Sequence, residues 1–160
     1  MGFIRKKKRT ACKVLTEREI LSEREALQIN PVTLAFVGDA VFSLYVRERL
    51  TLEIGGKTSE LQKVNAKAVS AQGQSAFCEK LIPLLTETES DVFRRGKNAK
   101  KGTKSKSASQ LEYNRSTGFE AVVGFLYFTG QTARIKELFA QIDKEFFEAA
   151  LTVKPFKPVR

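Results

Sequence analysis

The chain of 160 residues fits one domain, which at this length can bury about 70% of its unfolded surface and needs no disulfide or structural metal. The absence of histidine excludes Ser-His-Asp triads and histidine-ligated metals, and the wide separation of Cys12 and Cys78 argues against a zinc site. No apolar stretch has the length of a membrane span or the character of a signal peptide. The sequence therefore predicts a cytoplasmic protein with no membrane partner.

The formal net charge of +10 is concentrated in two segments. Residues 1–16 contain six basic residues and no acid, and residues 92–111 contain seven basic residues and no acid. Charge concentrated in this way is typical of a surface that binds a polyanion, although a solvated charge run is the ordinary alternative. We interpret residues 1–16 as a flexible basic tail of open role, residues 17–152 as a single domain and residues 153–160 as a second tail.

The first elements predicted along the chain are helices. Residues 15–27 have the pattern of a short amphipathic helix. Asn30 can cap a second helix, which runs to Leu50 with Pro31 in its first turn. Its expected buried face, at helical spacing, consists of Leu34, Val37, Val41 and Leu44.

One acid in this second helix is unusual. Asp39 lies off the expected buried face among mostly apolar neighbours, so its carboxylate needs an ionic partner or a cation. Gly38 precedes it, and a glycine inside a helix usually indicates a close approach of another backbone.

The middle of the chain predicts a third helix, capped by Thr58 and running to Leu81, and a short fourth helix capped by Thr88 or Ser90. The face expected for the third helix carries Leu61, Val64, Ala68 and Ala71, with a bend at Gly73. Residues 96–109 are rich in Lys, Ser, Gly and Thr, which predicts a mobile loop within a basic region of about residues 94–110.

A second unusual acid follows in the apolar helical stretch Gly118 to Gly130. Glu120 stands there with Gly124 one turn later, which repeats the close-approach signal of Gly38. Thr132 begins a last amphipathic helix. No convincing strand pattern occurs, so the predicted fold class is all-α.

Asp39 and Glu120 could meet and share a divalent cation. Two carboxylates suffice for Mg²⁺ when waters and substrate phosphates complete its ligand shell. Such a cation can activate water and stabilise phosphodiester displacement, a route open to a protein without histidine. From the pattern alone, half-exposed or salt-bridged helix acids are the commoner explanation of both residues.

Four stretches of the sequence resemble one family. FVGDAV at Phe36 to Val41 resembles the signature helix of the ribonuclease III family, and FEAVVGFLYFTG at Phe119 to Gly130 resembles its second catalytic helix. Between them, Lys63 to Phe77 and Arg94 to Thr103 are similar to Mini-ribonuclease III, the short bacterial branch without a double-stranded-RNA-binding domain. The resemblance covers about Ile29 to Ile142.

The resemblance implies an all-α homodimer whose two sites each cut one strand of an RNA duplex, generally with Mg²⁺ and with Mn²⁺ as an alternative. It assigns metal-binding and catalytic roles to Asp39 and Glu120. Longer family members carry further acids where this chain has Val32, Ala35 and Thr117. The short branch shares this reduced set, which leaves the number of metal ions per site open.

Without a separate RNA-binding domain, the basic region must supply affinity for the duplex, which proteins recognise mainly by shape and by phosphate and 2′-hydroxyl contacts. The residues assigned to RNA binding are Arg94, Arg95, Lys97, Asn98, Lys100, Lys101 and Lys104, with Arg115, Lys63 and Lys67 as further candidates. Each of these residues has an alternative role as an ordinary solvated side chain.

The sequence thus leads to a magnesium-dependent endoribonuclease that cleaves double-stranded RNA in the maturation of ribosomal RNA (23S precursor). The alternative is a non-catalytic dimer of the same fold that binds structured RNA. A DNA-binding helical regulator is a weaker third hypothesis, because no helix shows the polar, basic face that reads a major groove.

Overall fold

The computed structural model describes residues 19–100 and 108–151, with side chains up to residue 142. Within these ranges no strand occurs, which confirms the predicted all-α class. None of the helices in them has both the length and the apolar character needed to cross a membrane. In chain order the elements are α1 (Glu23–Ala26), α2 (Pro31–Arg49), a π-helical turn η1 (Leu50–Ile54), α3 (Thr58–Ala68), α4 (Ala71–Leu81), a 3₁₀ turn η2 (Ile82–Leu84), α5 (Glu87–Asn98), α6 (Gln110–Phe128) and α7 (Thr132–Leu151).

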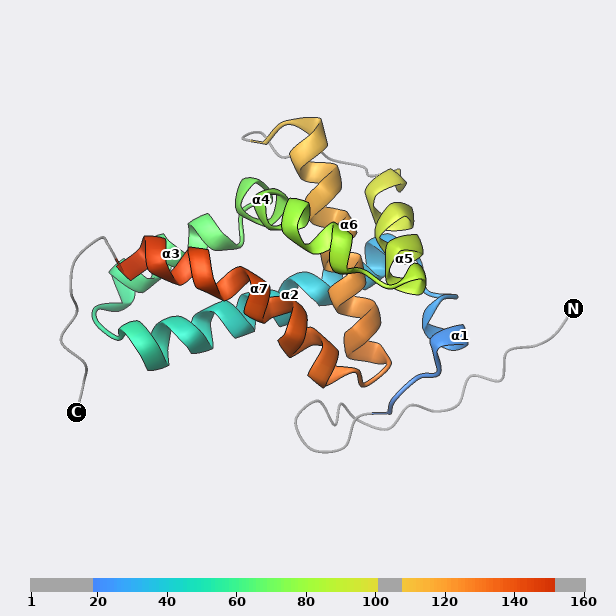
Figure 1. Cartoon of the computed structure of the whole chain (residues 1–160), viewed down its shortest axis with the longest axis horizontal. Helices are drawn as coiled ribbons and strands as arrows, with labels where there is room; N and C mark the ends of the chain where they lie inside the picture. The colour runs from blue at the N-terminus through green and yellow to red at the C-terminus, as the bar shows by residue number, and fades with distance from the viewer. Residues whose placement is uncertain (1–18, 101–107, 152–160) are drawn as a thin grey trace, which may run out of the picture.

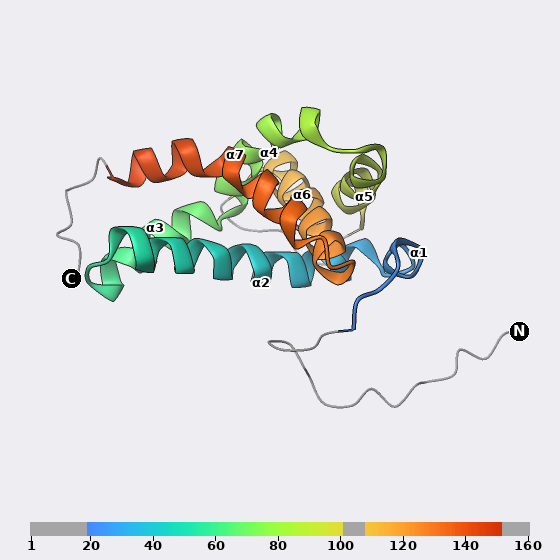
Figure 2. The ribbon, with the colours of Figure 1, turned by 60° about the horizontal axis from the view of Figure 1, so that its bottom comes forward.

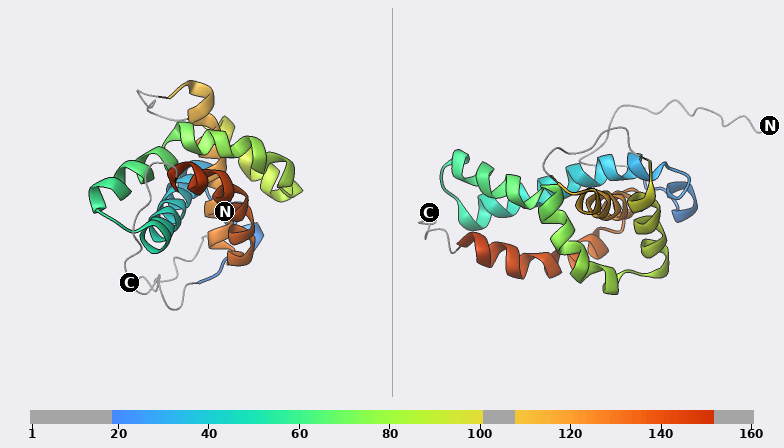
Figure 3. Two further views of the ribbon diagram at one scale, coloured as in Figure 1. Left: turned by 60° about the vertical axis from the view of Figure 1, so that its left-hand side comes forward. Right: turned by 90° about the horizontal axis from the view of Figure 1, so that it is seen from above.

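Helix α6 is the centre of the fold and packs against α2, α4, α5 and α7. In Figure 1 it crosses the long helix α2, with α5 on one side and α4 on the other. Figure 2 shows α2 and α7 as two long neighbouring elements, and Figure 3 shows the bundle from two further directions. The crossing of α2 and α6 therefore organises the domain.

Two glycines make this crossing unusually close. A Cβ atom at Gly38 of α2 would lie 1.8 Å from the carbonyl oxygen of Glu120, and one at Gly124 of α6 would lie 2.0 Å from the carbonyl oxygen of Leu34. Real Cβ atoms never approach backbone so closely, so the two helices can meet here only with glycine at both positions. The close approach predicted from these glycines is confirmed.

An aromatic cluster fills the core beside the crossing. The ring of Phe42 on α2 contacts Phe119 of α6 at 5.1 Å between centroids and Phe139 of α7 at 5.4 Å, both in edge-to-face arrangements. Such pairs add to the stability gained from burying the rings. Phe42 thus joins the three longest helices through one side chain.

The buried face of α2 differs from the predicted face. Asn30 caps the helix through a 2.8 Å bond to the N–H of Val32, as expected. Leu34, Gly38, Phe42 and Val46 are buried at every fourth position, whereas Leu44 is 64% exposed and the prediction for it was wrong. The buried face of α2 lies at these positions because α6 packs against α2 at Gly38, the one residue of α2 without a side chain.

The single helix predicted from Thr58 to Leu81 is two helices. α3 ends at Ala68, and Ser70 caps α4 by accepting a hydrogen bond from the N–H of Gly73 at 3.1 Å. The break lies before Gly73. A Cβ atom at Gly73 would lie 2.3 Å from the carbonyl oxygen of Lys67, so Gly73 can pack against the end of α3 only because it has no side chain. Thr58 is the first helical residue and Lys57 holds the cap position.

Helix α5 also differs from its prediction. Thr86, and not Thr88 or Ser90, caps it in a capping box with Glu89. The helix continues to Asn98, so the segment from residue 94 to residue 98 is helical and only the part beyond it connects to α6. Gly96 does not end the helix because it packs on α6, with a Cβ position 2.8 Å from the Cβ of Ala121.

A buried ion pair ties α7 to the start of α5. Both carboxylate oxygens of Glu89 accept hydrogen bonds from Arg134 at 2.9 Å, and one also accepts from the N–H of Thr86 at 2.9 Å. Burial alone would raise the pKa of Glu89, but the bonds from Arg134 and Thr86 hold that pKa below its usual value of 4.5. Ionised Glu89 therefore stabilises the fold.

We expect Glu89→Gln to lower the free energy of unfolding by about 3 kcal/mol at pH 7, because it leaves Arg134 without its buried partner. Since the pKa of Glu89 is lower in the fold, its contribution is present above pH 4.5 and is lost as the pH falls below it. Urea unfolding at pH 7 and pH 4 measures this difference. Glu137→Gln, which removes the exposed partner of Arg134, is the control and should cost under about 1 kcal/mol. A Glu89→Gln penalty that does not change with pH would contradict the assignment.

Candidate active site

An open groove lies beside the crossing of α2 and α6 and has a volume of about 370 Å³. Two of its lining residues, Asp39 and Glu120, are the acids predicted to meet. The groove is lined by Val32, Ala35, Phe36, Asp39, Val69, Ala71, Tyr113, Ser116, Thr117 and Glu120. It is large enough for a phosphate group with several waters, each of which takes about 30 Å³ in the liquid.

The helix crossing explains why the two acids share this groove. Gly38 touches the backbone of Glu120, and Asp39 is the next residue on α2. Asp39 is exposed to solvent and Glu120 is half-buried. Both acids therefore lie at the close contact of the two helices and line the same groove.

The surroundings of Asp39 compensate its charge only in part. Partial burial raises the pKa of its carboxyl group, while a hydrogen bond from the Gln74 side chain and the positive charge of Arg47 act in the opposite direction. The net effect is a raised pKa, so the ionised form lacks sufficient stabilisation from the protein alone. A bound cation would supply it.

The groove offers oxygen atoms that could bind a metal ion, but few of its side chains are acidic. Among residues 19–100 and 108–151 no three His, Cys, Asp or Glu side chains are grouped as a metal cluster. Val32, Ala35 and Thr117, the positions at which longer family members are expected to carry acids, all line the groove. The donor set fits a hard ion such as Mg²⁺, which commonly takes one or two carboxylates and completes its shell with water and phosphate.

Thiol chemistry is excluded at this site. Cys78 is buried near Glu120, and burial is the main cause that raises the pKa of its thiol to about 12. Arg115 opposes this shift and Glu120 adds to it. A thiol with this pKa stays protonated at neutral pH and is not a nucleophile.

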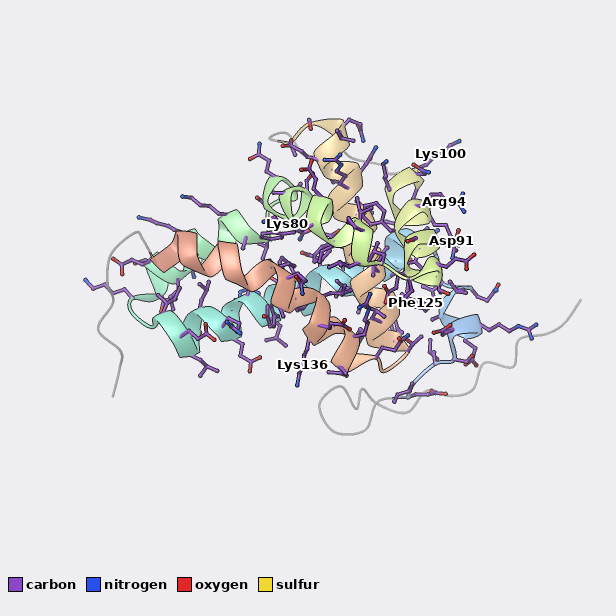
Figure 4. All side chains as sticks on the ribbon, in the orientation of Figure 1. Lys80, Asp91, Arg94, Lys100, Phe125 and Lys136 are labelled. Carbon is purple, nitrogen blue, oxygen red and sulfur yellow. The ribbon has the colours of Figure 1, made fainter. Side chains whose placement is uncertain are left out.

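The predicted RNA-binding residues lie at several places. Arg94, Asn98 and Lys100 are exposed, Arg95 and Lys97 are half-buried, and Lys101 and Lys104 lie outside the described residues. Figure 4 shows Arg94, which pairs with Asp91, and Lys100 on one side of the molecule, along α5 and just beyond it. The position of Gly96 against Thr117 places this end of α5 next to the wall of the groove.

The further candidates have different environments. Lys63 and Lys67 are exposed on α3, one turn apart, and are open to a ligand. Arg115 on α6 donates to Glu79 of α4 at 3.0 Å, and its side chain is 28% exposed. This pair favours a structural role for Arg115 in joining α4 to α6.

Two features of the site escaped the sequence analysis. Gln74 of α4 is buried and acts to lower the pKa of Asp39, although long polar side chains in helices are usually exposed and nothing in the neighbouring residues indicated otherwise. Tyr113 lines the groove two turns before Glu120. Its spacing of seven residues from Glu120 places both on one face of α6 and was the available signal.

Comparison with known proteins agrees with this geometry. Residues 32–131 match the Ribonuclease III domain family. The chain is 37% identical to a Mini-ribonuclease 3 of Thermoanaerobacter sp. (strain X514), with 82% of this chain and 94% of that protein covered, and 44% identical to one of Symbiobacterium thermophilum, with 76% and 93% covered. A crystal structure of a Fusobacterium nucleatum protein matches with a TM-score of 0.68 and 31% identity, over 73% of this chain and 93% of that one. The chain therefore belongs to the ribonuclease III family, within its Mini-ribonuclease 3 group, and is an endoribonuclease.

Proposed function

We propose that this endoribonuclease cleaves double-stranded RNA with Mg²⁺ held by Asp39 and Glu120, and that its natural substrate is a stem of the 23S ribosomal RNA precursor in the cytoplasm. The observation that supports the proposal is the groove that both acids line, beside the glycine contact of α2 and α6. The ribosomal substrate rests on the resemblance to the short branch. Mn²⁺ would serve as an alternative ion.

In this mechanism the carboxylates of Asp39 and Glu120 would hold the metal ion. The bound cation would act as a Lewis acid that activates water and neutralises charge developing on the phosphate. The rigid helix crossing keeps the two carboxylates in place before substrate arrives, which lowers the reorganisation needed for reaction. Thr117 and Tyr113 line the same groove.

The direct test is incubation of purified protein with an end-labelled RNA duplex, the same RNA as single strands, and a DNA duplex of equal sequence. We expect Mg²⁺-dependent cleavage of the RNA duplex alone and loss of cleavage with excess chelator. Binding of the duplex without cleavage in low salt would instead support the alternative, a non-catalytic dimer for structured RNA. A stem from the 23S precursor, compared with an unrelated duplex, tests the natural substrate.

The basic side chains at the end of α5 and just beyond it, of which Lys97 is half-buried and Lys100 exposed, support a contact with duplex phosphates. We expect Lys97→Ala combined with Lys100→Ala to weaken RNA binding and to lower the slope of log K against log salt by about two, one per lost contact. Fluorescence anisotropy between 50 and 300 mM salt measures the slope. Lys136 on α7 lies far from Lys100 in Figure 4, so Lys136→Ala is the matched control. Equal slopes in all three proteins would remove α5 from the interface.

An exposed apolar row on α2 supports the proposed homodimer. Val32 is 37% exposed, Phe36 is 80% exposed and Leu44 is 64% exposed, at multiples of four positions on one helix face. A second copy of the chain would cover this row and place two equivalent sites against two antiparallel strands. Sedimentation should give a dimer at micromolar concentration that Phe36→Glu dissociates, while Leu84→Glu on η2 leaves it intact. A wild-type protein that stays monomeric would contradict the two-strand mechanism.

A further inference from the structure

Arg47 is an exposed arginine about two turns beyond Asp39 on α2. Ser43 lies midway between them, four positions from each, so the three residues follow one side of the helix. Asp39 and Arg47 are both exposed, and about 12 Å of helix separates them. This side of α2 therefore leads from the groove to a guanidinium group on the surface.

The charge of Arg47 is not neutralised by the helix on which it stands. The positions one turn away in either direction hold Ser43, Leu44, Leu50 and Thr51. Glu48 is the next residue, and adjacent residues on a helix do not face each other. Arg49, by contrast, pairs with Glu53 at 2.8 Å. Among the residues that the structure describes, the Arg47 side chain forms no ion pair, so its charge is available to an anion outside the chain.

Helix α3 brings two further cations to this side of the groove. After η1 the chain reverses, and α3 returns along α2 and ends next to Val69, which lines the groove. Figure 2 shows α3 beside the C-terminal half of α2. Lys63 and Lys67 are exposed on α3 and lie four positions apart, where like charges repel each other. An anion bound between them would remove that repulsion.

The other side of the groove faces the end of α5. Gly96 of α5 packs on Thr117, which lines the groove, and Lys97 and Lys100 follow Gly96 in the chain. Figure 1 shows α3 and α5 on opposite sides of the crossing of α2 and α6. Basic side chains therefore flank the groove on two sides, and a polyanion laid across it would meet both groups.

We propose that Arg47, together with Lys63 and Lys67, binds phosphates of the cleaved RNA strand on the side of the groove opposite to α5. This inference rests on the proposed function, because it places the scissile phosphate at the groove. Since about two helical turns separate Arg47 from Asp39, the phosphate at Arg47 is a different one from the phosphate at the groove. Arginine suits this role because its planar guanidinium can bind a phosphate through two parallel hydrogen bonds. The strand thus crosses the groove from the end of α5 to α3.

Three variants of the full chain separate this role from a general effect of charge. Fluorescence anisotropy with a chelator present measures binding of an RNA duplex without cleavage. For Arg47→Ala we expect binding weaker by about five- to tenfold, a slope of log K against log salt lower by about one, and an unchanged Tm. Arg47→Lys keeps the charge, so the salt slope should match the wild type and affinity should fall by no more than about threefold. Lys136→Ala removes a cation from α7 and should bind as the wild type does.

Single methylphosphonate linkages, which lack the phosphate charge, locate the contacts on the duplex. A linkage at the phosphate bound by Arg47 should weaken binding by the wild type and leave binding by Arg47→Ala unchanged. Linkages identified in the same way with Lys63→Ala combined with Lys67→Ala should lie beside it on the same strand. Linkages identified with Lys97→Ala combined with Lys100→Ala should lie on the other side of the cut.

Each other result decides against the proposal. Arg47→Ala with the affinity and salt slope of the wild type would overturn it, as would weaker binding together with a lower Tm, because Arg47 would then be structural. Linkages for Arg47 that coincide with those for Lys97 and Lys100 would show that the strand does not cross the groove in this way. A wild type that binds the duplex without cutting it would contradict the proposed function, whereas the affinities and the order of the linkages would still test Arg47.

Discussion

Asp39→Asn and Glu120→Gln are each expected to reduce kcat on an RNA duplex by more than about a hundredfold, a loss of over about 2.7 kcal/mol of transition-state stabilisation. Each substitution keeps the size of the side chain and removes the charge that would hold the cation in the groove. Single-turnover cleavage with saturating protein measures the chemical step directly. RNA affinity should change little, because we propose that the basic residues near α5 supply most of the phosphate contacts.

A matched acid on the same helix controls for loss of charge. Glu48 of α2 is exposed and does not line the groove, so Glu48→Gln should cut RNA at the wild-type rate. Circular dichroism should show that all three variants remain folded. Wild-type cleavage by Asp39→Asn or by Glu120→Gln would contradict the assigned site.

The second large effect is expected at the glycine contact. Gly38→Ala or Gly124→Ala would place a methyl group about 2 Å from backbone of the facing helix, and backbone cannot rotate away as a side chain can. We expect each change to lower the free energy of unfolding by about 3 kcal/mol or more and Tm by about 10 °C. Activity below Tm should fall as well, since separation of α2 from α6 displaces Asp39 relative to Glu120.

Thermal unfolding by circular dichroism measures this effect. Thr33→Ala, an exposed change on the same helix, should alter stability by less than about 0.5 kcal/mol. Gly38→Ala and Gly124→Ala with the stability and activity of the wild type would show that the helices do not touch as described.

Local signals were sufficient to predict the close contact of α2 and α6 and the two acids beside it. Gly38 and Gly124 are visible as helix-interior glycines, and both mark the contact between α2 and α6. Asn30 caps α2 as its residue type predicts. Asp39 and Glu120 were notable because each is an acid in an apolar run, and both line the groove.

Features that depend on tertiary contacts could not be predicted in the same way. Helical spacing allowed several buried faces for α2, and only the position of α6 selects Phe42 over Leu44. Glycine is typical of loops, but Gly96 packs on Ala121, and α5 therefore continues past Gly96. The effect of Gln74 on the pKa of Asp39 acts between two helices, so no pattern within either helix predicts it.

The central claim is that Asp39 and Glu120 bind one divalent cation together at the crossing of α2 and α6. The most direct measurement is anomalous diffraction from crystals of the wild-type protein soaked in Mn²⁺. We expect an anomalous peak within about 2.5 Å of a carboxylate oxygen of Asp39 and of a carboxylate oxygen of Glu120. A peak bound to only one of them, or located away from the groove, would contradict it.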